Sequence, residues 1–144
     1  MTSKPVTRKK LLEIVFEASQ CFIPTDELTN EQKDRLDNIR YGLCDCKICK
    51  RALTSPITEW KALGHSNRKT YYIGISQDSI EFMAGIGKYG PPSIPRLIIP
   101  IFLLQLIKTI LHEIIHILSP ECNEEEVRDK TNAWLNSFDW SEVR

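Results

Sequence analysis

The most constraining feature of this sequence is an almost continuous apolar stretch, LIIPIFLLQLIKTILHEIIHIL, at residues 97–118. Such a stretch is long enough to cross a membrane. It also contains a lysine, a glutamate and two histidines, and charged groups at bilayer depth are costly. We therefore expect no membrane insertion and predict a core helix that begins after Pro100 and ends at Ser119-Pro120. A helix that is apolar on nearly every face must be covered by the rest of its domain.

The rest of the chain is long enough to supply that cover. The protein has 144 residues, of which 42% are hydrophobic and 26% charged, as in an ordinary globular domain. Its 19 basic and 19 acidic side chains cancel, so the basic excess that is typical of nucleic-acid-binding proteins is missing. We predict one domain over residues 1–144, with a helical, cysteine-containing part at 1–63 and a core part at 64–138.

Hydrophobic periodicity predicts two helices in the N-terminal part. Residues 8–20 have apolar side chains at helical spacing, and Pro24 closes that helix. Thr25 or Asp26 can cap a second, more polar helix that extends to about Arg40. The sparse apolar positions of this second helix predict that it lies on the surface.

Short strands are predicted next to the apolar helix. Residues 41–69 look irregular, whereas TYYIGIS at 70–76 predicts a strand, and 79–83 predicts a second strand that forms a hairpin with it. A connection rich in glycine and proline follows, and a last helix is predicted over 124–138. The fold class is therefore α+β, mainly helical, with a short β-hairpin or small sheet packed on the apolar helix.

The apolar stretch contains the pattern HExxH, as HEIIH at residues 112–116. Residues four apart lie on the same face of a helix, so His112 and His116 can bind one metal ion. Glu113 lies beside the first histidine, where a carboxylate can act as general base toward water that the metal activates. The pattern predicts Zn²⁺ as cofactor and Glu113 as the catalytic residue. The alternative is that both histidines are core residues with satisfied hydrogen bonds.

A third protein ligand is expected at the start of the last helix, where Glu124, Glu125 and Glu126 follow one another. Relative to the apolar stripe that begins at Val127, Glu124 lies within about 40° of the centre and Glu125 near the edge, whereas Glu126 points away. Glu124 is therefore the predicted third metal ligand, with Glu125 as the alternative. Glu126 is explained by a capping box with Asn123.

The segment TILHEIIHILSPECNEEEVRDKTNAWL resembles the core of the small zincin-like metallopeptidases of phages, prophages and some archaeal elements. In that family HExxH is followed, after a short turn, by a helix that begins with S/D/N-E-E-x-V. Residues 112–116 match the first motif and Asn123–Val127 match the second. The resemblance covers roughly residues 64–138. It implies a minimal zincin-like domain with a zinc site.

These features predict a zinc-dependent hydrolase, a peptidase that acts on a peptide or protein substrate. Zinc held by His112, His116 and Glu124 would polarise the scissile carbonyl, and Glu113 would take a proton from water and pass it to the leaving amine.

Contacts to the substrate are less well defined by the sequence. The strand at 70–76, if it borders the site, can pair with an extended substrate backbone. No group that would stabilise the oxyanion is evident. Tyr71, Tyr72 and His65 are candidates, although tyrosines in strands more often pack in the core.

Three of the five cysteines, Cys44, Cys46 and Cys49, form a C-x-C-x-x-C cluster. They are a second, weaker metal candidate, which would need a fourth ligand such as His65 or another cysteine. A disulfide or three free thiols are the alternatives. The N-terminus has no apolar segment typical of a signal peptide, so we expect a cytoplasmic protein with reduced thiols.

Two other classes of function stay open at this point. The basic stretch at 47–69 and the cysteine cluster are compatible with a metal-stabilised module that binds a protein or a nucleic acid. A nucleic-acid partner is not favoured, because aromatic residues are not interleaved with the basic ones. A zincin that keeps its metal but has lost turnover is the third class. The oligomeric state is not indicated.

Overall fold

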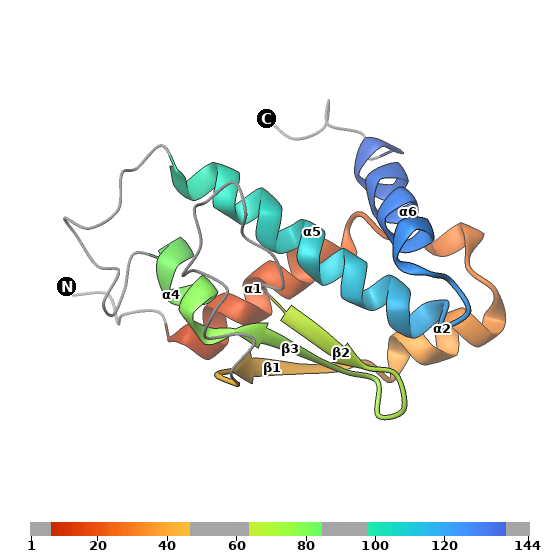
Figure 1. Cartoon of the computed structure of the whole chain (residues 1–144), viewed down its shortest axis with the longest axis horizontal. Coiled ribbons are helices and arrows are strands. Elements are labelled where there is room, and N and C mark those ends of the chain that lie inside the picture. Colours follow the sequence, from red (N-terminus) through yellow and green to blue (C-terminus); the bar gives the residue numbers. More distant parts are fainter. Residues whose placement is uncertain (1–6, 47–63, 85–97, 138–144) are drawn as a thin grey trace.

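Helix α5, Ile98–Leu118, is the predicted core helix, and it lies at the centre of the computed structural model, which describes residues 7–46, 64–84 and 98–137 (Figure 1). The surrounding helices and the sheet pack against it. Contrary to the prediction, the helix begins before Pro100. A proline is tolerated there because the amide groups of a first helical turn have no partner within the helix.

The cover over α5 is nearly complete along its C-terminal half. Ile110, Leu111 and Ile114 are fully buried, whereas Leu104, nearer the N-terminal end, is 45% exposed. None of the helices in the described parts of the chain combines the length and the apolar character needed to cross a membrane.

Helix α1, Arg8–Gln20, was predicted with these bounds and is confirmed. Thr7 caps it, because its hydroxyl accepts a hydrogen bond from the backbone N–H of Lys10 at 3.1 Å. The apolar face of α1, which includes Leu12 and Phe16, is buried in the same core as α5.

The second predicted helix is shorter than expected. A 3₁₀ turn, η1 at Thr25–Glu27, precedes helix α2 at Asn30–Asp37. The prediction of a cap at residue 25 or 26 is wrong, because Thr29 and Gln32 form a capping box that starts the helix later. The predicted end near residue 40 is also wrong, since the helix ends at Asp37 and Arg40 belongs to a β-strand. Arg35 of α2 donates a hydrogen bond to the carbonyl of Leu118 at 3.0 Å and so caps the end of α5.

A mixed sheet of three strands lies beside α5. The strands are β1 (Arg40–Cys44), β2 (Gly64–Asn67) and β3 (Tyr72–Ser76), in the order β1-β3-β2. The central strand β3 pairs in parallel with β1 and antiparallel with β2.

Part of the region that was predicted to be irregular therefore forms strands. The prediction for 41–69 is wrong at β1 and β2, and residues 47–63 lie outside the described part of the chain. β2, with the sequence GHSN, contains glycine and asparagine, which are depleted in strands, so pairing with β3 determines its conformation.

The predicted strand at 70–76 is confirmed over Tyr72–Ser76 as β3, whereas Thr70 and Tyr71 belong to the preceding turn, and the predicted strand at 79–83 is wrong. This segment belongs to helix α4, Gln77–Ala84. The hydroxyl of Ser76 accepts from the backbone N–H of Ser79 at 3.3 Å and starts the helix. A short segment of this composition is compatible with a strand or a helix, and in the helix Glu81 is 6% exposed and pairs with Arg8.

Helix α6, Glu124–Ser137, follows α5 after a short turn. Its predicted capping box is confirmed: Asn123 Oδ1 accepts from the N–H of Glu126 at 2.8 Å, and Glu126 Oε1 accepts from the N–H of Asn123 at 3.2 Å. Val127 and Thr131 are buried. Phe138, at the predicted end of this helix, lies outside the described residues. The molecule is thus α+β and mainly helical with a small sheet, as predicted.

The central position of α5 leads to a prediction about stability. Replacing the fully buried Ile110 with alanine should lower the free energy of unfolding by about 2–5 kcal/mol, because a cavity is left in the core. The matched substitution at Ile14 of α1, which is 50% exposed, should change it by about 0.5 kcal/mol or less. Urea denaturation in metal-free buffer measures both. Equal losses would contradict the burial described here.

Candidate metal centre

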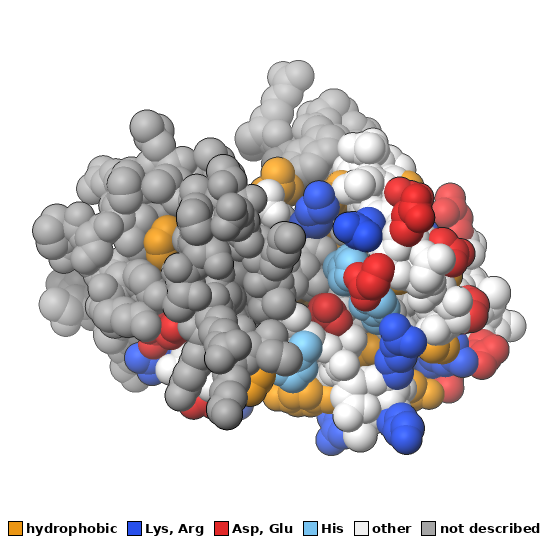
Figure 2. All heavy atoms as spheres, in the orientation of Figure 1, with side chains coloured by type: hydrophobic (Ala, Val, Ile, Leu, Met, Phe, Trp, Pro, Cys, Tyr) orange, Lys and Arg blue, Asp and Glu red, His pale blue; other side chains and the backbone are white. Residues whose placement is uncertain are grey.

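His112 and His116 lie one turn apart on α5 and point their imidazoles toward the same place. Their Nε2 atoms are 3.2 Å apart, and the two rings meet edge to face with centroids 4.8 Å apart. His116 is 5% exposed, which is unusual for a histidine without a specific partner. In Figure 2, histidine side chains on this face lie between acidic and basic ones.

Glu124, in the first turn of α6, completes a group of three. One carboxylate oxygen lies 3.0 Å from His112 Nε2 and the other lies 2.6 Å from His116 Nε2. Nitrogen and oxygen ligands bound tetrahedrally to zinc are roughly 3.3 Å apart, given metal–ligand bonds of about 2.0–2.1 Å. The spacing of these three side chains therefore fits one small metal ion.

The position of Glu124 follows from how α6 packs on α5. Val127, fully buried, packs against Ile115, and Glu124 lies almost one turn before it on the same side of α6. Glu125 is exposed and is not part of the group, and Glu126 makes the cap instead. Of the two glutamates proposed as third ligand, the structure brings only Glu124 to the histidines.

The electrostatics of two members of the group, His116 and Glu124, favour the protonation states that bind metals. Burial lowers the pKa of His116, and the charges of His112 and Arg68 act in the same direction against the attraction of Glu124. Burial alone would raise the pKa of Glu124, but the charges of the two histidines and their hydrogen bonds lower it. A neutral imidazole and an ionised carboxylate are the forms that bind metal.

Glu113 lies beside this group and is held by the neighbouring strand. Ser66 of β2 donates a hydrogen bond from its hydroxyl to Glu113 Oε2 at 2.6 Å. Burial raises the pKa of Glu113 to about 7, and the charge of Glu124 adds to this rise, whereas the Ser66 hydrogen bond and Arg68 oppose it. A carboxylate with such a pKa is suited to general base catalysis near neutral pH.

Arg68, in the turn between β2 and β3, is a site residue that the sequence analysis missed. Its Nη2 lies 3.0 Å from His116 Nδ1, and its Nη1 donates to the carbonyl of Pro120 at 3.2 Å. The turn is held by Asn67, whose side-chain oxygen accepts from the N–H groups of Lys69 and Thr70. The basic character of the sequence around Arg68 was evident, but nothing in the sequence indicated that Arg68 contacts α5.

The residues named as candidates for oxyanion stabilisation lie elsewhere. Tyr71 packs against the core with a φ of 55°, and Tyr72 lies against Gly42 of β1 on the sheet. His65 contacts Cys44, with 3.1 Å between Nε2 and Sγ. Among the described residues, these three do not contact the His112, His116 and Glu124 group.

The predicted cysteine cluster is partly described. Cys44 and Cys46 form a second group with His65, in which one ligand atom from each residue lies within 4.8 Å of the others. Cys49 lies outside the described residues, as does the part of the basic stretch at 47–63.

The geometry predicts which glutamate matters for metal affinity. Glu124→Ala should weaken zinc binding by about 100-fold or more, because loss of a ligand should cost at least as much as the 10–100-fold seen for groups that only orient ligands. Glu125→Ala removes the same charge from the next position and should change zinc affinity little. Competition with a chromogenic chelator measures both affinities. Equal weakening by the two substitutions would count against Glu124 as a ligand.

The raised pKa of Glu113 predicts a pH-dependent effect on stability without metal. The unfolded chain ionises Glu113 near pH 4.5 and the folded chain only near pH 7. The stability that the protonated carboxyl contributes is thus fully present below pH 4.5 and is lost as pH rises through 7.

As pH rises from 5 to 8, the free energy of unfolding of Glu113→Gln should therefore increase relative to that of the unsubstituted protein, by up to about 3 kcal/mol. Because the comparison is between two proteins that share His116 and Glu124, the titration of those groups largely cancels. Urea denaturation with a chelator present measures the difference at each pH. A difference that stays constant over this range would contradict the burial of the carboxyl.

Comparison of the chain with models of protein families, with curated proteins and with solved structures finds no match. The resemblance to zincin-like metallopeptidases therefore stays a prediction, and the function has to be argued from the site itself.

Proposed function

We propose that this protein is a zinc-dependent hydrolase that cleaves peptide bonds. The observation that supports it is the meeting of two imidazoles and one carboxylate from α5 and α6, with a second carboxylate beside them. His112, His116 and Glu124 would hold the zinc, which when bound would supply a Lewis acid at the scissile carbonyl.

Glu113 would act as the general base. Its position next to His112 on α5 keeps the carboxylate at the edge of the metal site, and Ser66 fixes the orientation of one of its oxygens. Burial raises the pKa of Glu113 to about 7, so the carboxylate would accept a proton from water and return it to the leaving amine near neutral pH.

Arg68 would stabilise the negative charge that develops on the substrate carbonyl oxygen. Its guanidinium contacts His116 and is therefore within reach of the same site. It is a permanent cation with several donors, as this role requires. This assignment replaces the earlier candidates Tyr71, Tyr72 and His65.

Strand β2 would hold the substrate backbone. The expectation that strand 70–76 pairs with the substrate is wrong, because β3 is already paired on both sides. In the described sheet β2 is an edge strand, it packs against α5, and its Ser66 contacts Glu113. An extended peptide added to this edge would lie beside the candidate metal site.

The test is cleavage of a mixture of unstructured peptides, followed by mass spectrometry, with zinc-loaded protein. Glu113→Gln should keep the metal and lower the rate by about 10²–10⁴-fold, the usual contribution of a general base. Glu121→Gln makes the same change at an exposed position after α5 and should leave the rate unchanged.

Two results would overturn the proposal. One is a purified protein that fails to bind zinc at the His112 site under non-chelating conditions. The other is equal behaviour of the unsubstituted protein and Glu113→Gln in every cleavage assay, which would favour a metal-stabilised binding module instead.

A further inference from the structure

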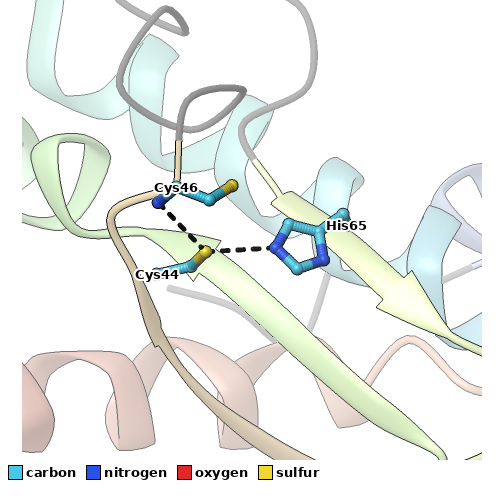
Figure 3. A group of neighbouring side chains, drawn as sticks. All are labelled: Cys44, Cys46 and His65. Atoms are coloured by element: carbon cyan, nitrogen blue, oxygen red, sulfur yellow. Dashed lines mark hydrogen bonds between the residues drawn. The ribbon is translucent and has the colours of Figure 1, made fainter.

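A second set of metal-binding side chains lies on the sheet, on the face opposite to α5. Cys44 ends β1 and His65 lies in β2, on either side of the central strand β3 (Figure 3). Successive side chains of a strand point to opposite faces. Ser66 of β2 faces Glu113, so its neighbour His65 faces away from the first site.

Gly74 of β3 makes this meeting possible. It is the register partner of His65 in β2 and of Gly42 in β1, and Cys44 lies two residues farther along β1, opposite Ser76. A Cβ atom at Gly74 would lie 2.9 Å from two ring atoms of His65 and 3.2 Å from Cys44 Cβ. The absence of a side chain at this position therefore lets Cys44 and His65 meet over β3, with 3.1 Å between Sγ and Nε2.

Cys46 completes the set just after β1. Its thiol lies near the other two, with one ligand atom from each residue within 4.8 Å of the others (Figure 3). Its backbone N–H donates to Cys44 Sγ at 3.5 Å, a contact that offsets negative charge on a metal-bound sulfur. Sulfur and nitrogen ligands of a tetrahedral zinc ion are about 3.6 Å apart, so a small opening of the Cys44–His65 pair would admit the ion.

We propose that Cys44, Cys46 and His65 bind a second zinc ion, which is separate from the ion at His112 and holds β1 and β2 together across β3. Two thiolates and an imidazole form a soft ligand set that suits zinc. None of the three residues has a part in the proposed hydrolysis, so this site is structural.

The second ion would also steady the first site. β2 is a short strand of four residues, and its only strand partner in the described sheet is β3. An ion bound to His65 would fix the strand one residue before Ser66, which orients Glu113. Loss of this ion should therefore loosen the Ser66–Glu113 contact without removing any ligand of the first ion.

The experiment measures zinc per chain by elemental analysis of protein purified under reducing, non-chelating conditions. The unsubstituted protein should hold about two zinc ions. The double variant Cys44→Ser/Cys46→Ser should hold one zinc ion. The control Cys21→Ser removes an exposed thiol at the C-terminal end of α1 and should still hold two. His112→Ala should also hold one, because it leaves the second site intact.

A milder variant moves the ligands without removing them. Gly74→Ala should push the His65 ring aside and lower the zinc content by one. Gly42→Ala is the matched control in β1, because its new Cβ would meet the side chain of Tyr72 and none of the three ligands. It should keep both ions.

Thiol alkylation followed by mass spectrometry tests the site even if a cysteine variant fails to fold. In the unsubstituted protein and in His112→Ala, zinc should slow the alkylation of Cys44 and Cys46 at least tenfold and leave exposed Cys21 unaffected. Equal alkylation of Cys44 and Cys46 with and without zinc would overturn the proposal. The unsubstituted protein could instead hold a single zinc ion that persists in His112→Ala and is lost in the variant without Cys44 and Cys46. That result would support the second site and contradict the proposed function.

Discussion

The packing of the first turns of α6 onto the last turns of α5 is the interaction on which the candidate site depends. Val127 is fully buried against Ile115, between the two histidines of α5 in sequence. This contact fixes the rotation of α6 about its axis, and with it the direction of Glu124. Without this contact, the exposed Glu124 carboxylate would sample many positions in solvent, and holding it beside the imidazoles would cost conformational entropy.

The sheet contributes the other half of the site through a single strand. β2 is held from one side by β3 and packs against α5, so that consecutive residues face different surroundings: Ser66 faces Glu113, and His65 faces Cys44. A small domain thereby uses four residues of strand to reach two separate groups of metal-binding side chains. A strand can do this because consecutive side chains point to opposite faces, whereas consecutive side chains on a helix differ in direction by only about 100°.

Features with a local or periodic cause could be predicted from the sequence. The core helix, α1, β3 and the capping box at Asn123 depend on side chains within a few residues of one another, and each was found. The rotation of α6 also followed from its apolar stripe, so Glu124 could be preferred over Glu125. What failed depended on partners distant in sequence. β2 has little β-propensity of its own and depends on β3, and the helical segment α4 includes the buried Glu81, whose partner Arg8 lies 73 residues away.

Arg68 was missed for the same reason, since its contact with His116 joins residues 48 positions apart. That contact also decides where the ring proton of His116 lies. A guanidinium only donates, so Nδ1 must accept, and a neutral ring then has its hydrogen on Nε2, facing Glu124. Ligation through Nε2 would move that hydrogen to Nδ1, where it would face a second donor. A metal bound through Nε2 and the Arg68 hydrogen bond to Nδ1 therefore exclude each other on a neutral ring, so that metal binding at His116 would require Arg68 to give up this contact.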